Sequence, residues 1–425
     1  MNENDSERIA GLLAGIGARP AASEEDADII VVNTCAVRAK SVEKLHSYLG
    51  RLRLLKRARP RLIGIAGCVA QIESERLLEK PAVADFVVGP DNYLRFPEIL
   101  RESLGSRVVE TALSREWRET PAARGEPQAE GGRAYVTIME GCDNFCAYCI
   151  VPFARGREKH RPLASILAEV EDLVRGGYKE IQLLGQNVNR YRDPQGGADF
   201  PALLSRVAGP LGPEWVRFLT SHPRDLSQET VAAMAASARI CRQIHLPLQS
   251  GSASVLARMN RGYSRTEYLE RIAWLRGAMP EISITTDIIV GFPGESEADF
   301  RETLSALELI RFAAIYSFRY SPRPGTAAAL LADDVPLETK RRRLIEVQSL
   351  QKEIQTAFHR SLIGRTQKVL ASGPARKEKA DAFQGRNAGG QVVNFTSETD
   401  VAGRFVEIEI TGAGPYSLRG RLLRA

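Results

Sequence analysis

The sequence has few of the features that mark a secreted, a membrane or a zinc-ribbon protein. Six cysteines in 425 residues are too sparse for a disulfide framework. No apolar run is long enough to span a bilayer, and no signal-peptide core is present. The chain holds a single C-x2-C pair, whereas structural zinc sites usually draw on two separated pairs of ligands. These absences favour a cytoplasmic protein of a reducing compartment with no membrane partner.

Composition adds a mild preference for a polyanionic partner. The hydrophobic fraction of 44% and the charged fraction of 26% are those of a globular protein, and the length predicts two or three domains. The net charge of +6 is weak evidence for nucleic acid by itself. One basic run is more often a solvated face than a binding site, but three runs together favour a polyanionic substrate. They are Arg51, Arg53, Lys56, Arg57, Arg59 and Arg61; Arg155, Arg157, Lys159 and Arg161; and residues 361–425.

The most informative feature is a group of three cysteines, Cys142, Cys146 and Cys149, in the spacing C-x3-C-x2-C. A four-iron cubane takes one thiolate per iron. Three local thiolates therefore leave one iron open for the amino and carboxylate groups of a small ligand. The alternative is a zinc site with His160 or a distant cysteine as the fourth ligand. The matching functional alternative is a non-catalytic zinc protein that binds RNA.

Residues 1–104 alternate between helical and strand patterns. Asp5 or Ser6 is predicted to cap a helix that runs to about Gly15. Alternating strands and helices predict a doubly wound parallel sheet. Cys35 and Cys68 follow the carboxyl ends of two strands, and such ends line one crevice, so both are candidates for one site. The expected strands are 28–33, 62–66 and 86–89, with a helix at 38–57.

Residues 105–132 lose periodicity and are predicted to be a linker. Residues 133–360 then predict six β/α units, an incomplete barrel whose first strand delivers the cysteines to its carboxyl-terminal face. Within it, Cys241 is expected to be a buried apolar side chain, and His222 and His245 are expected to brace strand ends. The expected strands are 134–139, 179–184, 215–220, 242–247, 282–290 and 314–320. The expected helices are 163–176, 227–237, 265–278, 296–311 and 336–360.

Residues 361–425 change to short β-rich runs separated by Gly-rich turns, for example 368–371, 392–395 and 404–410. This pattern predicts a small antiparallel barrel of about five strands. Barrels of this size often bind oligonucleotides.

Several longer runs of sequence carry a family resemblance over essentially the whole chain. The chain resembles the methylthiotransferases of the radical S-adenosylmethionine (SAM) superfamily, and among them the tRNA-directed 2-methylthio-N6-dimethylallyladenosine synthases (MiaB type). Its last block resembles a TRAM domain. The runs are Asn33-Thr-Cys-Ala-Val-Arg38, Gly67-Cys-Val-Ala-Gln71, Gly141-Cys-Asp-Asn-Phe-Cys-Ala-Tyr-Cys-Ile-Val-Pro152, Leu184-Gly-Gln-Asn-Val-Asn189, His245-Leu-Pro-Leu-Gln-Ser-Gly-Ser252, Asp287-Ile-Ile-Val-Gly-Phe-Pro-Gly-Glu295 and Tyr320-Ser-Pro-Arg-Pro-Gly-Thr326.

The resemblance implies two four-iron clusters and SAM as cofactors. Cys142, Cys146 and Cys149 would hold the cluster that cleaves SAM to a deoxyadenosyl radical, and Cys35 and Cys68 would hold a second one. The family's third ligand of that second cluster ends a strand that would precede Met1. We therefore expect a misplaced start or a truncated chain, a sheet that lacks this strand at its centre and a cluster short of one thiolate.

The implied reaction converts N6-dimethylallyladenosine to its 2-methylthio derivative at the tRNA position on the 3′ side of the anticodon. The expected partners are the tRNA anticodon loop and a reductant such as flavodoxin or ferredoxin, with the enzyme a monomer. The alternative substrates are threonylcarbamoyladenosine in tRNA and a ribosomal protein side chain.

The candidate contacts to SAM and RNA follow strand ends or flank the cysteines. Gln186, Asn187, Gln249, Ser250 and Asp287 are expected at the barrel rim, where hydrogen bonds between strand ends are the alternative role. Arg155 and Arg157 are expected to neutralise phosphate or the SAM carboxylate, and Arg323 to lie beside the substrate base.

Overall fold

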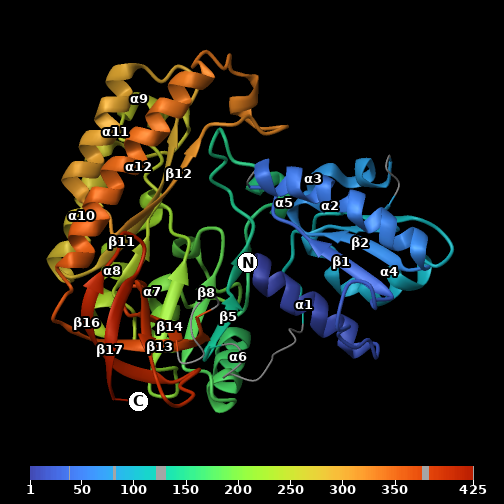
Figure 1. Ribbon diagram of the computed structural model, residues 1–425. Coiled ribbons are helices and arrows are strands. Elements are labelled where there is room, and N and C mark those ends of the chain that lie inside the picture. Colours follow the sequence, from blue (N-terminus) through green and yellow to red (C-terminus); the bar gives the residue numbers. More distant parts are fainter. Residues whose placement is uncertain (38, 80–82, 121–130, 376–381, 425) are drawn as a thin grey trace. The chain divides into compact units, whose positions relative to one another are not determined.

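The computed structural model describes residues 1–425 except 38, 80–82, 121–130, 376–381 and 425. The described residues divide into two compact units (Figure 1). The N-terminal unit comprises Met1–Arg124, Glu140–Lys159 and Arg323–Thr326. The barrel unit comprises Gly125–Met139, His160–Pro322 and Ala327–Ala425. Two short strands, β6 (Met139–Glu140) and β7 (Lys159–His160), mark where the chain passes between them.

The N-terminal unit is a four-stranded parallel sheet in the order β1-β2-β3-β4, with helices on both faces. Helices α1 and α4 cover one face through a core that includes Ile9 and Phe96. Helices α2, α3 and α5 cover the other through Leu52 and Val69. The predicted doubly wound sheet is therefore confirmed. Its elements are α1 (Asn2–Gly15), β1 (Ile29–Asn33), α2 (Ala39–Ala58), β2 (Leu62–Ala66), α3 (Cys68–Glu73), β3 (Phe86–Val88), α4 (Phe96–Glu102), β4 (Val108–Glu110) and α5 (Val151–Arg155).

Three expectations for this unit need correction. Helix α1 begins at Asn2, so Asp5 lies inside the helix and is buried rather than capping it. Strand β4 lies in the segment predicted to be a linker, because three residues with parallel pairing to β3 are too few to show a period. Strands β1 and β2 pair directly from Ile29↔Leu62 onward, so no gap separates the four described strands. The part of the predicted linker at 121–130 lies outside the described residues.

The barrel unit contains all six predicted β/α strands. They form two three-stranded parallel sheets, β5-β8-β9 and β10-β11-β12, joined by a bridge between Val216 and Ile240. Helices α11 and α12 lie side by side along one flank (Figure 1). The strands are β5 (Arg133–Thr137), β8 (Glu180–Leu184), β9 (Trp215–Leu219), β10 (Gln243–His245), β11 (Ser283–Val290) and β12 (Ala314–Arg319). The helices are α6 (Leu163–Arg175), α7 (Phe200–Val207), α8 (Gln228–Ala236), α9 (Ala253–Arg258), α10 (Arg265–Ala278), α11 (Glu297–Ile310) and α12 (Leu337–Arg360).

The C-terminal part of the barrel unit is a closed five-stranded barrel, as predicted. The strands pair in the order β13-β14-β15-β17-β16 around a core that includes Val369, Phe395 and Ile408. Closure leaves no free sheet edge in this small domain. Its strands are β13 (Thr366–Pro374), β14 (Ala382–Asn387), β15 (Val392–Thr396), β16 (Phe405–Ala413) and β17 (Leu418–Arg424).

The small barrel is fixed to the amino-terminal ends of the β/α strands by a buried charge cluster. Glu180, at the start of β8, accepts hydrogen bonds from Nε of Arg133 (2.6 Å) and Nε of Arg217 (2.7 Å). Arg217 also donates to the main-chain oxygens of Asn387 (2.6 Å) and Ala388 (2.9 Å) in the turn after β14. Cys241 packs with Trp215 and Leu370 at the same junction, which fits the apolar role predicted for it.

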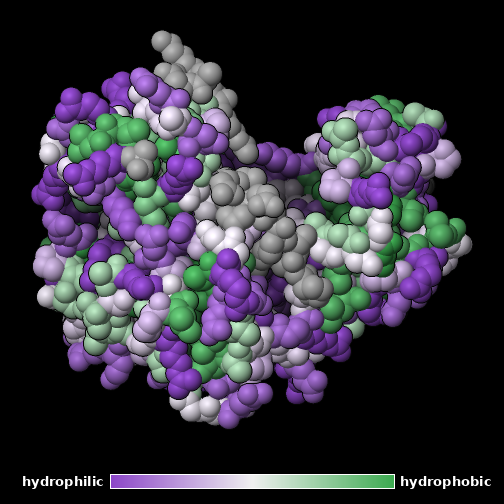
Figure 2. Space-filling view, turned by 90° about the horizontal axis from the view of Figure 1, so that it is seen from below, coloured by the Kyte–Doolittle hydropathy of each residue, from purple (hydrophilic) through white to green (hydrophobic). Residues whose placement is uncertain are grey.

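No helix within the described ranges is long and apolar enough to cross a membrane. Figure 2 shows hydrophobic side chains on one face as separate groups among hydrophilic ones.

Replacing Glu180 by Gln should destabilise the barrel unit strongly. The change leaves two mostly buried guanidinium groups without their counter-charge, which typically costs about 3–5 kcal/mol of the free energy of unfolding. Urea unfolding and hydrogen exchange of the β8 and β14 peptides would measure this. Glu281→Gln is the matched control, since Glu281 pairs with Arg365 at 2.8 Å on the exposed surface, where a pair contributes less than about 1 kcal/mol. Equal effects of the two substitutions would contradict the role given to Glu180.

Candidate cluster-binding site

The three-cysteine loop, residues 141–149, is closed by a backbone conformation that only glycine adopts easily. Gly141 has a φ of +80°, in the left-handed region. A Cβ there would lie 2.0 Å from the main-chain oxygen of Arg157. The Cys142 amide donates to the oxygen of Gly156 (3.2 Å), and the Cys149 amide donates to the oxygen of Cys146 (2.9 Å). The loop therefore folds back on the segment that follows it, and a tight turn brings Cys146 and Cys149 together.

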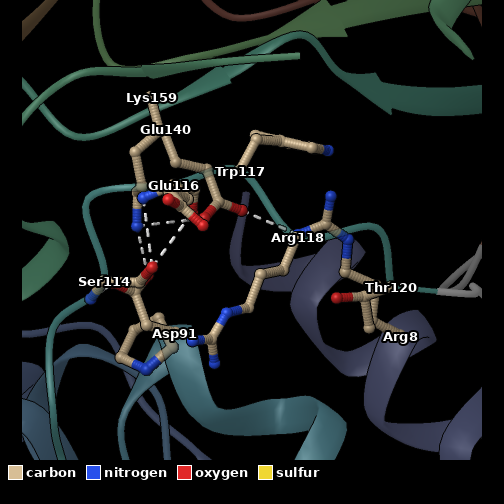
Figure 3. Close-up of a pocket in the computed structure, with 10 residues that line it drawn as sticks. Arg8, Asp91, Ser114, Glu116, Trp117, Arg118, Thr120, Glu140 and Lys159 are labelled. Atoms are coloured by element: carbon tan, nitrogen blue, oxygen red, sulfur yellow. Dashed lines mark hydrogen bonds and ion pairs between the residues drawn. The ribbon is translucent and has the colours of Figure 1, made fainter. Parts of the chain in front are cut away.

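Buried charges hold the residues on either side of this loop (Figure 3). Glu140 accepts a hydrogen bond from Nη1 of Arg8 (2.7 Å), and Lys159 forms an ion pair with Asp91. Lys159 also lies 4.0 Å from Glu140, so the two ends are joined. The Arg8 guanidinium lies 5.8 Å from the ring of Trp117. These five side chains border a polar cavity of about 20 Å³. The cavity has room for about one water molecule.

Helix α5, which follows Cys149 directly, packs on the sheet that carries the other two candidate cysteines. Ile150 and Ala154 belong to the same apolar core as Ala36 and Cys68. The three-cysteine loop and the Cys35 and Cys68 pair therefore belong to one unit. The sequence indicated the two groups separately but not that one helix joins them.

Arg155 is not available to phosphate or to a SAM carboxylate, contrary to the prediction. Its side chain is buried, its Nε donates to Cys68 Sγ at 3.3 Å, and its Nη atoms form an ion pair with Asp5 on α1. A hydrogen bond from the Cys35 thiol, together with the positive charge of Arg155, lowers the pKa of Cys68. Arg155 thus stabilises a thiolate at Cys68.

The cysteine thiols of both groups are the donors that iron–sulfur clusters take, although within the described residues no three His, Cys, Asp or Glu side chains are arranged to hold a metal ion. All six cysteines are thiols, and burial raises the pKa of Cys142 to about 11, so a bound metal must displace a proton there. At the second site, Cys35 and Cys68 are in hydrogen-bond contact. The buried Tyr93 hydroxyl and Asn33 Oδ1 have no hydrogen-bond partner among the described residues. Apart from the three cysteines of the loop, the described part of the N-terminal unit contains no further cysteine that could be a third ligand of this second site.

Arg157 lies at the surface of the N-terminal unit, and Arg323 is half-buried in it. Arg157 is exposed, is held by Asp143 (2.6 Å) and has its guanidinium 5.3 Å from the ring centre of Phe145. Arg323 donates from Nη2 to the main-chain oxygen of Val37 (2.8 Å). Arg323 thus lies near the cysteines, which is compatible with the role predicted for it.

The predicted SAM contacts lie in the barrel unit at the carboxyl ends of strands. Asn187 donates to Asp225 (2.7 Å), Ser250 bonds Thr303 (3.3 Å), and Asp287 lies 3.4 Å from Nε2 of His245. Gln186 follows β8 in a half-buried position. The buried Asn187 Oδ1 and Gln249 Oε1 have no partner among the described residues. These two oxygens are available to a ligand. Asp287, within β11, contacts His245 at the end of β10, which is the strand-end role given as the alternative, whereas Ser250 bonds Thr303 on helix α11.

The histidines serve the fold. His245 bonds Thr285 Oγ1 (3.0 Å) and braces the end of β10 as predicted. His222 accepts from the Arg224 amide (3.3 Å) and caps the short turn Pro223–Asp225 that follows β9. Burial and the charge of Arg261 lower the pKa of His222 to about 2. His160, the alternative zinc ligand, accepts from the Arg192 amide at 3.4 Å.

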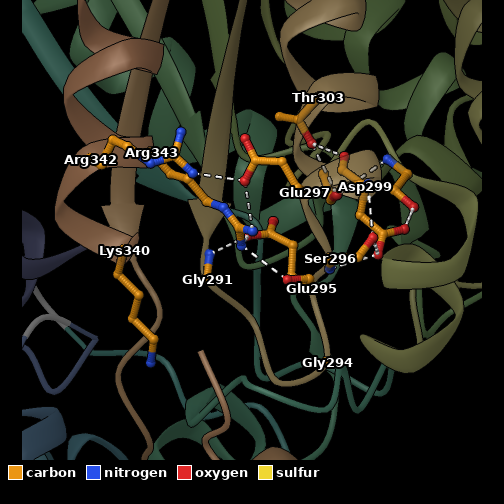
Figure 4. A network of polar contacts seen from close by, with 12 residues as sticks. Gly291, Gly294, Glu295, Ser296, Glu297, Asp299, Thr303, Lys340, Arg342 and Arg343 are labelled. Carbon is orange, nitrogen blue, oxygen red and sulfur yellow. Dashed lines mark hydrogen bonds and ion pairs between the residues drawn. The ribbon is translucent and has the colours of Figure 1, made fainter. Parts of the chain in front are cut away.

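One rim network was missed from the sequence. Buried Glu295 accepts from the Gly291 amide (2.5 Å) and from Nη1 of Arg343 on α12 (2.7 Å), and burial raises the pKa of its carboxyl (Figure 4). Glu295 Oε1 has no partner within the described residues. The Gly-Phe-Pro-Gly-Glu run, which ends in Glu295, could have indicated that this glutamate has a role. Nothing in the sequence indicated its partner Arg343, which lies 48 residues later.

Comparisons with known proteins identify the three blocks of the chain. Residues 136–307 match the radical SAM superfamily, residues 1–89 match the uncharacterized protein family UPF0004, and residues 360–423 match the TRAM domain. A tRNA-2-methylthio-N(6)-dimethylallyladenosine synthase of Geobacter metallireducens is 48% identical over 99% of this chain and 96% of its own length. A protein of the same name from Solibacter usitatus is 43% identical over 99% and 95%. The chain belongs to the tRNA-2-methylthio-N(6)-dimethylallyladenosine synthase family.

Solved structures agree with this family at the level of the fold. The radical SAM methyltransferase TsrM of Kitasatospora setae is similar with a TM-score of 0.55 at 16% identity, over 76% of this chain and 68% of that one. Radical SAM architecture in the barrel unit is therefore shown by both sequence and fold, and the predicted family is confirmed.

Gly141→Ala should prevent iron incorporation at the three-cysteine loop. The added methyl group collides with the Arg157 oxygen, and the left-handed φ is strained for alanine. We expect reconstituted protein to lose about four irons per chain, the content of one cubane. Iron and sulfide analysis would measure this. Gly105→Ala is the control, because nothing lies within 4 Å of its added Cβ; iron retention by Gly141→Ala would refute the closure argument.

Proposed function

We propose that the protein is a radical SAM methylthiotransferase that converts N6-dimethylallyladenosine to its 2-methylthio derivative in tRNA. The decisive observation is the three-cysteine loop, closed and anchored in a chain whose relatives are 42–48% identical over nearly its whole length. Relatives from three bacteria carry the dimethylallyladenosine name, which favours this substrate over threonylcarbamoyladenosine or a protein side chain. The nucleoside is the one on the 3′ side of the anticodon.

The chemistry requires a cofactor, because the C2–H bond of adenine is not activated toward acids or bases. An iron–sulfur cluster with SAM supplies one-electron chemistry when bound. Cys142, Cys146 and Cys149 would hold it. Glu140, Lys159 and their partners keep the two ends of the loop in place.

Cys35 and Cys68 would hold a second cluster that carries the sulfur. The close approach of the two thiols supports this assignment. Arg155 orients Cys68 and neutralises its charge, and Asp5 orients Arg155. Asn187 and Gln249, whose buried side-chain oxygens lack partners among the described residues, would contact SAM.

RNA binding is assigned to the small barrel rather than to the basic run at 51–61. In that run Arg51, Lys56 and Arg59 are paired with Glu25, Asp85 and Asp28, so much of its charge is neutralised within the protein. The small barrel presents exposed arginines, namely Arg386, Arg404, Arg419 and Arg424, whereas Arg421 is paired with Glu409. Contacts to phosphate make affinity fall steeply with salt. The tRNA anticodon loop and a flavodoxin or ferredoxin reductant are the proposed partners of a monomeric enzyme.

Cys146→Ser should abolish SAM cleavage and product formation, because one iron loses its ligand. The measurement is mass spectrometry of 5′-deoxyadenosine under strong reductant and of 2-methylthio nucleosides in tRNA from a complemented deletion strain. Cys241→Ala is the matched control, since this cysteine lies in an apolar core of the barrel unit, and it should keep its iron and its activity. An unchanged 2-methylthio content in the deletion strain would overturn the tRNA assignment.

A further inference from the structure

Exposed phenylalanine is confined to the surroundings of the three-cysteine loop. All 14 phenylalanines of the chain lie in described segments, and two of them are exposed, Phe145 to 44% and Phe153 to 42%. Phe145 directly precedes Cys146, and Phe153 follows Cys149 by one helical turn. Large apolar side chains grouped at the surface mark a binding site more often than chance.

The ring of Phe145 is held in place by its backbone and by Arg157, which suits it to stacking on a base. Its φ of +46° is uncommon for a bulky residue and marks a position constrained by its surroundings. Arg157 lies over its ring at 5.3 Å and is itself anchored by Asp143 at 2.6 Å. Nucleobases stack on aromatic rings and on arginine planes, and this pair presents both to one ligand.

Phe153 offers an apolar surface instead. Gly325 is its neighbour, and a Cβ added at Gly325 would lie 3.8 Å from the ring, so the glycine leaves the ring uncovered. Two residues earlier in the chain, Arg323 donates to the Val37 oxygen at 2.8 Å. Val37 is 53% exposed and follows Cys35 by two residues. The segment 323–325 thus reaches from Phe153 to the edge of the second cysteine group.

We infer that Phe153 is the specificity-determining contact for the N6-dimethylallyl group, and that Phe145 with Arg157 stacks on a base whether or not it is prenylated. The inference rests on the proposed function. The dimethylallyl group is a five-carbon apolar substituent that needs an apolar surface near both cysteine groups, since C2 and N6 belong to one purine. Phe153 lies on the helix that joins those groups, whereas Phe145 is covered on one side by a cation.

The experiment compares two anticodon stem-loop RNAs that differ only in the dimethylallyl group, bound to full-length reconstituted protein. We expect the wild type to bind the prenylated RNA about tenfold more tightly, a typical discrimination for a small apolar group. Phe153→Ala should reduce this ratio to about one by weakening the prenylated RNA alone. Phe153→Leu, which keeps an apolar side chain, should restore most of the ratio. Binding is measured by fluorescence anisotropy.

Phe145→Ala should weaken both RNAs several-fold and leave the ratio unchanged. Leu104→Ala, at a position that is 78% exposed in the N-terminal unit, should change neither affinity. Iron content of every variant establishes that the loop is intact. An unaltered ratio in Phe153→Ala, or no preference by the wild type, overturns the inference. If the wild type also forms no 2-methylthio product, the proposed function fails with it; product formation with an unaltered ratio refutes the inference alone.

Discussion

The cysteine site depends on charges that are buried and must therefore be paired. Asp5 and Arg155 form an ion pair with almost no exposure, and Arg8 and Glu140 form a second one. Removing one member of such a pair leaves an uncompensated charge, which is far more costly than losing a surface pair. One member of each pair, Arg155 or Glu140, lies beside the three-cysteine loop, and the other, Asp5 or Arg8, lies on helix α1. The position of the loop therefore depends on a helix more than 130 residues earlier in the chain.

Buried ion pairs also occur at both ends of the strands in the barrel unit. Glu180 gathers Arg133 and Arg217 at the amino-terminal ends and connects them to the small barrel. Glu295 gathers Arg343 at the carboxyl end of β11. Helix α12 carries Arg343 near its start, and His359 near its end bonds the Gly414 oxygen at 2.7 Å. One 24-residue helix thus links the proposed SAM rim to the proposed RNA-binding domain.

Much of this arrangement could be predicted, because strands in parallel sheets are long apolar runs and cysteine spacing is local. The six barrel strands and the closed small barrel followed from such patterns, and the spacing of Cys142, Cys146 and Cys149 indicated one short loop. The burial of Arg155 could not be predicted, since a basic residue next to a cysteine motif can equally well be a substrate contact. Its two partners lie 87 and 150 residues away, and no local pattern connects them. Strand β4 was missed for a different reason, because three residues define no period.

Helix α5 concentrates these roles in a single turn. Its five residues place Ala154 in the apolar core and Arg155 on Cys68, while Phe153 faces outward. Successive helical residues are separated by 100°, so neighbouring positions face different surroundings while sharing one rigid backbone. A shift of this turn would move the Cys68 contact and the proposed prenyl contact together. The proposed prenyl contact of Phe153 and the Arg155 contact to Cys68 are therefore coupled, because they lie on one short backbone segment. A change in the packing of Ala154 is expected to disturb both contacts.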